Sequence, residues 1–128
     1  MMNITNLYTL LEKTPEDPLV KIRITKVTGD ENLSLYAAIL EPGVMVRPHF
    51  HESGIETYQI IEGEGVIKIG RPEGTGVIWT GTTPVQTGDC FTVEPGIVHQ
   101  LENTGQVPMY ASFCCSPDHL AGDRFFID

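Results

Sequence analysis

Short apolar runs separated by regular turn sequences occupy most of this chain, and they constrain its fold more than any other feature. Val20, Ile22 and Ile24 alternate with polar residues, and this period of two predicts a half-buried strand. Further runs of strand length follow at 33–40, 44–51, 56–62, 65–69, 76–80, 90–94, 97–103 and 108–115. Turn sequences rich in Gly, Pro and Asp separate these runs. Strands this short and this evenly spaced predict an all-β fold, an antiparallel sandwich or barrel.

The N-terminal residues follow a different period. Ile4, Leu7, Leu10 and Leu11 recur at helical spacing, and Pro15 would end a helix that they form. We therefore expect one short N-terminal helix before the first strand. The rest of the chain contains no linker, repeat or low-complexity tract, and 128 residues suit one domain. We expect a single domain over residues 1–128.

The charge balance argues against two classes of partner. Eight Lys and Arg residues stand against seventeen Asp and Glu, which gives a formal net charge of −9. Nucleic acids and anionic membranes attract clustered cations, and this sequence clusters none. The N-terminal sequence has no basic segment followed by a long apolar run, so we expect no signal peptide, and no stretch is long enough to span a bilayer.

The cysteines point to a reducing environment. Cys90, Cys114 and Cys115 form an odd and sparse set. Neighbours on a strand point to opposite faces, so Cys114 and Cys115 are poor disulfide partners for each other. The simplest expectation is a reduced, cytoplasmic protein.

Three of the four histidines fall in two compact β segments together with one glutamate. His49 and His51 are two residues apart, so on a strand both imidazoles point to one face. A tight turn after His51 could return Glu56 to the side of this pair, and His99 begins another strand after Pro95-Gly96. Imidazoles with one carboxylate on converging strands form the ligand set of a mononuclear divalent site. These ligands favour Fe(II), Mn(II), Ni(II), Co(II) or Zn(II) over thiophilic metals.

Other polar residues near this set have alternative interpretations. Arg47 shares strand parity with the two histidines and should face the interior to bind an anion, unless Pro48 introduces a bulge and leaves it in solvent. Tyr58 shares parity with Glu56 and could donate a proton near the metal, or simply pack in the core. His119 reads as a polar residue of the C-terminal tail. The tail ends in an apolar stretch that could fold back and bring Asp118 or His119 to the site.

Two segments resemble the motifs of a known family, the cupins. The segment 43–63, which contains His49, His51 and Glu56, resembles the first cupin motif at every specified position. The segment 88–103, which contains His99 and ends at Asn103, resembles the second, except that Glu94 stands where the family usually has proline. The resemblance implies a single-domain jelly-roll β-barrel with one divalent metal ion held by His49, His51, Glu56 and His99. The spacer 64–87 is longer than the shortest in the family, and we expect it to add a hairpin around Gly74.

The resemblance allows several functions. One is a metal-dependent enzyme of the dioxygenase, isomerase or epimerase kind that acts on a small oxygenated anion, with Tyr58 and Arg47 as candidate catalytic residues. The alternative is a non-catalytic module that contains the metal and binds a sugar or an organic acid. The resemblance also points to a homodimer, as do the apolar residues of the N-terminal helix and of the strand from Val20 to Val27.

Overall fold

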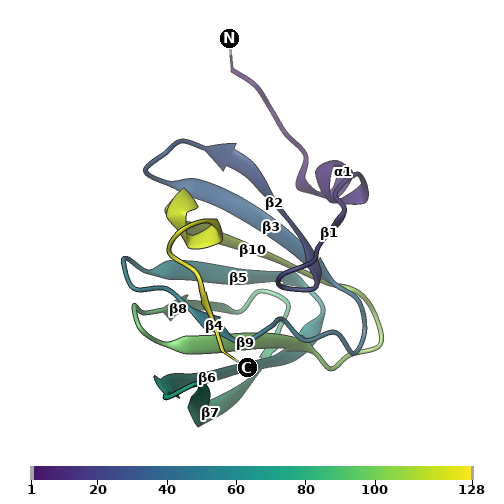
Figure 1. Cartoon of the computed structure of the whole chain (residues 1–128). Coiled ribbons are helices and arrows are strands. Elements are labelled where there is room, and N and C mark those ends of the chain that lie inside the picture. Colours follow the sequence, from purple (N-terminus) through teal and green to yellow (C-terminus); the bar gives the residue numbers. More distant parts are fainter. Residues whose placement is uncertain (1, 128) are drawn as a thin grey trace.

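The structure is a computed structural model that describes residues 2–127, and its strands form two sheets that face each other (Figure 1). One sheet has six strands in the order β1-β2-β3-β10-β5-β8, and the other has five in the order β11-β4-β9-β6-β7. Neighbouring strands within each of the two sheets run antiparallel. The predicted all-β jelly roll is confirmed. The predicted closure into a barrel is not, because no ladder joins the two sheets within residues 2–127.

The strand bounds follow the predicted runs closely in most places. The six-stranded sheet contains β1 (Glu16–Asp17), β2 (Ile22–Gly29), β3 (Ser34–Leu40), β10 (Met109–Cys115), β5 (Glu56–Glu62) and β8 (Cys90–Val93). The five-stranded sheet contains β11 (Phe125–Phe126), β4 (His49–Phe50), β9 (Val98–Asn103), β6 (Glu64–Glu73) and β7 (Gly76–Gln86). The predicted run 44–51 is mostly irregular, and only its end forms β4.

The predicted N-terminal helix is present as α1 (Leu7–Glu12). It begins where the side chain of Asn6 accepts a hydrogen bond from the amide of Thr9 at 3.1 Å, an ordinary helix cap. Leu11 is the buried residue of this helix and packs against β3 through Ala37 and Ile39. Within residues 2–127 we find no helix with the length and apolar character needed to cross a bilayer.

The spacer between the two motif segments forms the expected hairpin. β6 and β7 pair from Glu64↔Gln86 to Glu73↔Gly76, and Gly74 turns the chain with a φ of 61°, a conformation that glycine adopts without strain. The cysteines Cys90, Cys114 and Cys115 are all free thiols, in agreement with the expectation from their spacing.

The core lies between the two sheets. Buried side chains from β3, β5 and β10 meet side chains from β6, β7 and β9 in one cluster, whose members include Leu40, Ile60, Met109, Ile67 and Leu101. A continuous apolar layer of this kind is the main stabilising contribution in a sandwich.

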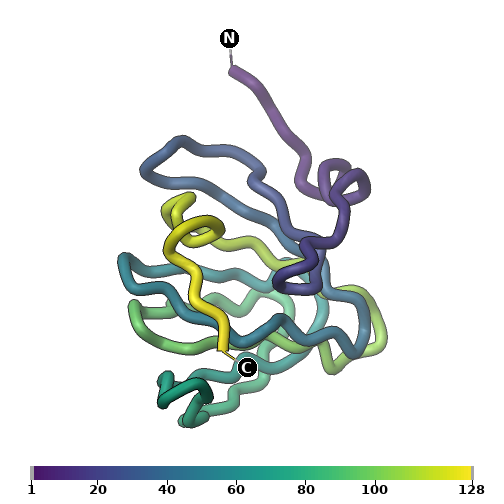
Figure 2. The backbone as a smooth tube through the Cα atoms, viewed as in Figure 1, coloured from purple at the N-terminus to yellow at the C-terminus, as the bar shows by residue number. Residues whose placement is uncertain are grey.

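The C-terminal segment links the two sheets at one end of this core. After β10 the chain forms a short 3-10 helix (Pro117–Leu120) and then β11, which pairs with β4. β10 belongs to one sheet and β11 to the other, so residues 116–124 cross between them, drawn as the yellow end of the tube in Figure 2. We call residues Ser116–Ile127 the C-terminal strap.

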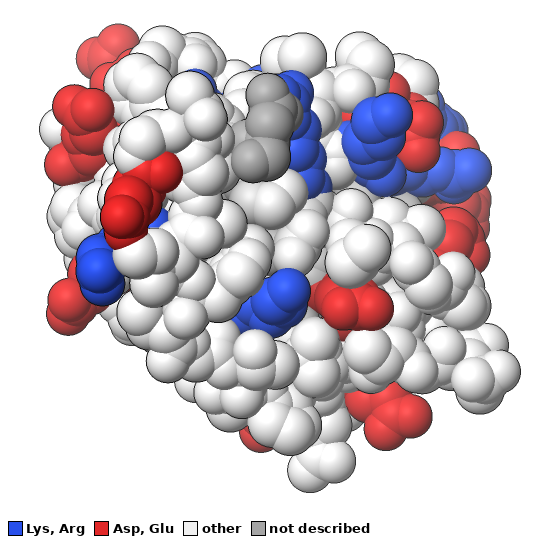
Figure 3. All heavy atoms as spheres, turned by 60° about the horizontal axis from the view of Figure 1, so that its bottom comes forward, with Lys and Arg blue, Asp and Glu red and all other residues white. Residues whose placement is uncertain are grey.

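The charges on one face of the molecule are mixed. In Figure 3 Lys and Arg side chains lie beside Asp and Glu rather than gathering into one extended basic surface.

Candidate metal centre

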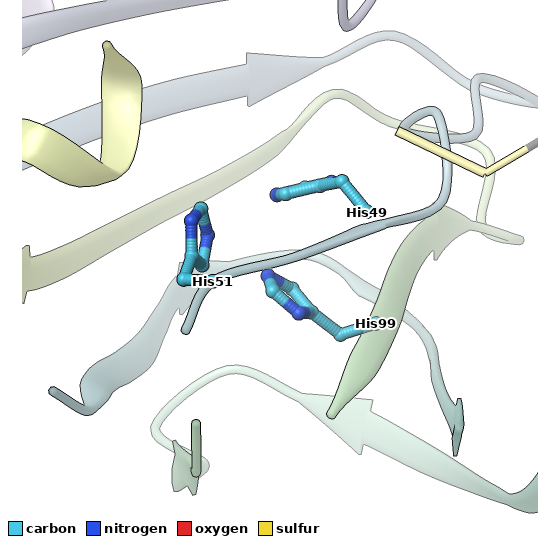
Figure 4. A group of neighbouring side chains, drawn as sticks. All are labelled: His49, His51 and His99. Atoms are coloured by element: carbon cyan, nitrogen blue, oxygen red, sulfur yellow. The ribbon is translucent and has the colours of Figure 1, made fainter. Parts of the chain in front are cut away.

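Strand register brings the first pair of histidines together. His49 of β4 and His99 of β9 are direct partners in the antiparallel ladder, and their ring centroids lie 4.3 Å apart. His51 follows β4 on the same side, with its ring centroid 5.1 Å from that of His49 and 5.3 Å from that of His99. Figure 4 shows the three rings converging on a common space. All three side chains are buried.

Each of these rings is fixed by a backbone carbonyl. Nδ1 of His49 lies 2.8 Å from the carbonyl oxygen of Arg47, and Nδ1 of His99 lies 3.1 Å from that of Ile97. Nδ1 of His51 lies 2.6 Å from the carbonyl oxygen of Asp123. A carbonyl oxygen only accepts, so Nδ1 carries the hydrogen in each ring. With Nδ1 turned to a carbonyl, the Nε2 atoms point into the shared space, the arrangement that orients histidine ligands in metal sites.

The opposite sheet supplies the carboxylate. Glu56 begins β5, is 2% exposed, and points its oxygens at the histidines. Its Oε2 lies 3.2 Å from Nε2 of His51, and its Oε1 lies 3.3 Å from Nε2 of His99. The hydroxyl of Tyr58, two residues along β5, donates to Oε1 at 3.0 Å. Tyr58 thus lies on the same face as Glu56, as its parity predicts.

The protonation of these groups suits a cation. Burial lowers the pKa of His49 to about 3, with a further contribution from the neighbouring His99, so this ring is neutral near pH 7. Burial alone would raise the pKa of Glu56. The hydrogen bond from His119 is the largest contribution that opposes burial, and the pKa of Glu56 is held well below its usual range. The pKa of Tyr58 is raised well above its ordinary value by burial and by the charge on Glu56, so its hydroxyl keeps its proton.

This donor set fits a divalent transition metal ion. Nε2 of His51 and Nε2 of His99 are buried without a hydrogen-bond partner, and both face an ionised carboxylate. Lone pairs that face one another in a buried space are costly unless a cation lies between them. The ligand atoms of His49, His51 and His99 lie within 4.8 Å of one another, so the site could hold a metal ion. The atoms of His51, Glu56 and His119 form a second, overlapping group within the same limit.

The buried neutral His49 makes a prediction for the metal-free protein. A histidine whose pKa is about 3 in the folded state and 6.5 in the unfolded state binds its proton only on unfolding between these values. The free energy of unfolding should therefore fall by about 2 kcal/mol from pH 6.5 to pH 4.5. The pKa of His119 is raised by folding, so its contribution to the free energy of unfolding is present throughout this pH range. The pKa of Glu56 is lowered by folding, so its contribution is lost only below this pH range. Urea unfolding with a chelator present measures the change.

The matched variant for this prediction is His49→Gln. It removes the titrating ring, so its stability should vary less between pH 6.5 and pH 4.5 than that of the native chain. An equal fall in both proteins would assign the pH dependence to other groups.

A narrow cavity leads to the site. The space open to a water molecule is about 40 Å³, with an apolar wall from both sheets and a polar end formed by the three histidines, Glu56 and Tyr58. Among the described residues that line it, Arg124 is the sole Lys or Arg. The guanidinium of Arg124 lies 3.5 Å from Oδ2 of Asp17 and 5.1 Å from the ring centroid of Phe126.

Arg47 does not line the cavity, contrary to what its parity suggested. Its guanidinium lies over the ring of Phe126, 4.4 Å from the centroid. The parity argument requires a regular strand, but Val46 and His49 both line the cavity although they are an odd number of positions, three, apart. This segment pairs with β9 at Met45↔Glu102 and again at His49↔His99, so it contains one extra residue between the two pairs, where Pro48 has no N–H to donate. Of the two alternatives for Arg47, the backbone therefore agrees with the one in which the strand bulges at Pro48.

The C-terminal strap brings His119 to the site, the alternative that the apolar end of the chain left open, together with Asp123, which the sequence analysis did not name. His119 is 1% exposed, and its Nδ1 lies 3.0 Å from Oε2 of Glu56. The carboxylate of Asp123 accepts hydrogen bonds from the amides of Glu52 and Ser53 at 2.7 and 2.9 Å. The apolar Phe125-Phe126-Ile127 stretch was the only signal for this return. Asp118, by contrast, is exposed.

Cys115 at the end of β10 is a further neighbour of Glu56. Burial, and then the negative charge of Glu56, raise the pKa of this thiol well above its ordinary value. In the metal-free protein it therefore remains a protonated thiol.

Comparison with known proteins identifies the family. Residues 36–114 match the family model described as a cupin domain. This chain belongs to the cupin family. An uncharacterized protein of Methanocaldococcus jannaschii is 31% identical over 95 residues, which cover 74% of this chain and 69% of the relative. The oxalate-binding protein of Thermotoga maritima is 39% identical over 71 residues, which cover 55% of this cupin and 50% of that protein.

A solved structure supports the fold over the whole length. An uncharacterized conserved protein with a double-stranded β-helix domain from Klebsiella pneumoniae superposes with a TM-score of 0.72 at 19% identity. The match covers 100% of this cupin and 99% of that chain. At this identity the likeness concerns the architecture of the two sheets alone.

Proposed function

We propose that this cupin binds one divalent transition metal ion through His49, His51, Glu56 and His99 and acts on a small oxygenated anion. The observation that carries the proposal is the convergence of three imidazoles beside an ionised Glu56, with Nε2 of His51 and Nε2 of His99 buried and without a hydrogen-bond partner. Fe, Mn, Ni, Co and Zn are all compatible with nitrogen and carboxylate ligands. When bound, such an ion supplies Lewis acidity and open coordination positions for an oxygen ligand.

The residues around the site would hold and orient a ligand. Glu56 is fixed by a donor on each oxygen, from Tyr58 and from His119. The protonated hydroxyl of Tyr58 lines the cavity and is the candidate proton donor beside the bound molecule. The apolar wall keeps bulk water away, which strengthens electrostatic interactions at the polar end.

Arg124 supports an anionic ligand. It takes the role first expected for Arg47, because its guanidinium lines the same cavity as the histidines and can bind a carboxylate through two hydrogen bonds. The narrow cavity favours a ligand with few non-hydrogen atoms. The Thermotoga maritima relative is named for binding oxalate, and we infer a ligand of that class, a short dicarboxylate or hydroxy acid.

Calorimetric titration of oxalate and of related short acids into the Co(II)-loaded and the metal-free protein tests this proposal. We expect binding only to the loaded protein, and about 10- to 100-fold weaker binding in Arg124→Gln, because a hydrogen bond to a charged group is lost. The control is Arg47→Gln, which should bind like the native chain. Equal binding with and without Co(II), or an effect of Arg47→Gln alone, would contradict the proposed site.

The alternative is a metal-containing binding module without turnover. The name of the oxalate-binding relative favours it, as does the engagement of both Tyr58 and His119 with Glu56, because neither group is then free to act as a general base. Oxygen uptake and isomerisation can be followed over catechols, enolisable diketones, hydroxy acids and sugar phosphates. Tight binding with no turnover for any metal would select the binding module.

We also propose that the chain forms a homodimer. The outer edge of β2 is paired with β1 at only two positions, Arg23 and Ile22, so most of this edge is available for another strand. The exposed apolar side chains of Ile4 and Leu19 lie before β2 in the sequence. An open edge beside exposed apolar residues favours pairing with a second copy.

A further inference from the structure

His119 engages the carboxylate of Glu56 from the C-terminal strap. The ring is buried, and its two nitrogens face atoms that only accept hydrogen bonds. Nδ1 lies 3.0 Å from Oε2 of Glu56, and Nε2 lies 2.5 Å from the carbonyl oxygen of Ser53. Each nitrogen can therefore donate, one to the carboxylate and one to the loop between β4 and β5.

The two oxygens of Glu56 have matching surroundings. Oε1 accepts from the hydroxyl of Tyr58 and faces Nε2 of His99. Oε2 meets Nδ1 of His119 and faces Nε2 of His51. Each oxygen thus has one donor that fixes it and one bare imidazole nitrogen across from it. A carboxylate held from both sides in this way is pre-oriented toward an ion shared with the imidazoles.

Ring geometry separates this role from direct ligation. The rings of His119 and His51 stack in parallel, with centroids 4.2 Å apart and planes inclined by 6°. An imidazole lone pair lies in the plane of its ring, so an ion in the plane of His51 lies off the plane of His119. The stack also limits rotation of the His51 ring, whose Nδ1 is held by the carbonyl of Asp123 in the same strap.

We propose that His119 is a positioning residue for Glu56 and His51, and that the C-terminal strap is thereby a structural part of the metal centre. This inference rests on the proposed metal site. The strap fixes the site at three places: His119 on Glu56, the carbonyl of Asp123 on His51, and the carboxylate of Asp123 on the amides of residues 52 and 53. Coupling is reciprocal, so a metal ion that benefits from the ordered strap must also stabilise the strap.

Co(II) titration of two variants tests the role of His119. His119→Phe keeps a ring that can stack on His51 but has no donor, and it should bind Co(II) about 10- to 100-fold more weakly than the native chain. His119→Gln can still donate to Glu56 and should recover most of the affinity. Asp118→Asn, an exposed neighbour on the same turn, is the control and should change nothing.

Hydrogen exchange supplies a readout that is independent of affinity. Co(II) should slow exchange of the amides of Glu52 and Ser53, which donate to Asp123, in the native chain and in His119→Gln, but much less in His119→Phe. Equal Co(II) affinity and equal protection in His119→Phe and the native chain would overturn the inference and leave the metal site intact. A native chain that binds no Co(II) would instead overturn the proposed function, and this inference with it.

Discussion

Replacing His99 with alanine should reduce the divalent metal content of the protein from about one ion per chain to background. His99 contributes one of three Nε2 atoms that converge beside Glu56, and its loss leaves a smaller donor set around a buried carboxylate. We expect Co(II) affinity to fall at least about 100-fold, more than for loss of a residue that only orients a ligand. Elemental analysis of the purified protein and competition titration with a chelator both measure this loss.

The design needs a second ligand variant and a control from the same region. His49→Ala should behave as His99→Ala does, because the two residues are partners in one ladder. Thr57→Ala lies next to Glu56 on the exposed face of β5 and should keep the native metal content. Affinity in the native protein should also fall at low pH, since imidazole must be neutral to ligate. Equal metal content in His99→Ala, His49→Ala and Thr57→Ala would contradict the proposed ligand set.

Periodicity was a sufficient guide wherever the backbone is regular. Glu56 and Tyr58 are two residues apart on β5, and their side chains meet, as period-two reasoning requires. The hairpin around Gly74 also forms where its turn sequence predicts it. In both places the backbone ladder alone determines which face a side chain occupies, so the sequence contains the needed information.

The same reasoning failed where the ladder is interrupted. The position of Arg47 depends on the conformation of Pro48 and on the late start of β4 at His49, and a rule of alternation cannot describe either. Its guanidinium instead packs on Phe126, a residue that follows it by 79 positions in the chain. Contacts over that separation depend on the three-dimensional path of the strap.

His119 shows most clearly what sequence periodicity could not predict. It lies on a 3-10 turn with no periodic neighbours, and it meets Glu56 across a sequence separation of 63 residues. Only the apolar end of the chain indicated that this segment returns to the sheets. The four ligand candidates could be predicted because each lies in a motif tied to a strand. The group that fixes their carboxylate lies in an irregular segment, and its position required the structure.

Asn103→Ala should lower the free energy of unfolding by about 2–4 kcal/mol without changing the metal affinity of the folded protein. Asn103 ends β9, four residues after His99, and is completely buried. Its Nδ2 donates to the carbonyl oxygens of Leu40 and Val107, both at 2.9 Å, and its Oδ1 accepts from the amide of Gly105 at 2.9 Å. Alanine leaves these three backbone groups without the partner that satisfies them, and an unsatisfied buried group costs about 1–3 kcal/mol.

Urea unfolding of the metal-free protein measures this loss, and Thr104→Ala, an exposed neighbour, is the control that should stay within about 0.5 kcal/mol of the native value. Asn103 was recognised as the last residue of the second motif, beside a candidate ligand, yet its hydrogen bonds fix β3 and the loop after β9 rather than the metal centre. Native stability in Asn103→Ala would show that water replaces its hydrogen bonds. A loss of Co(II) affinity in folded Asn103→Ala would show instead that this end of β9 and the histidines are one coupled unit.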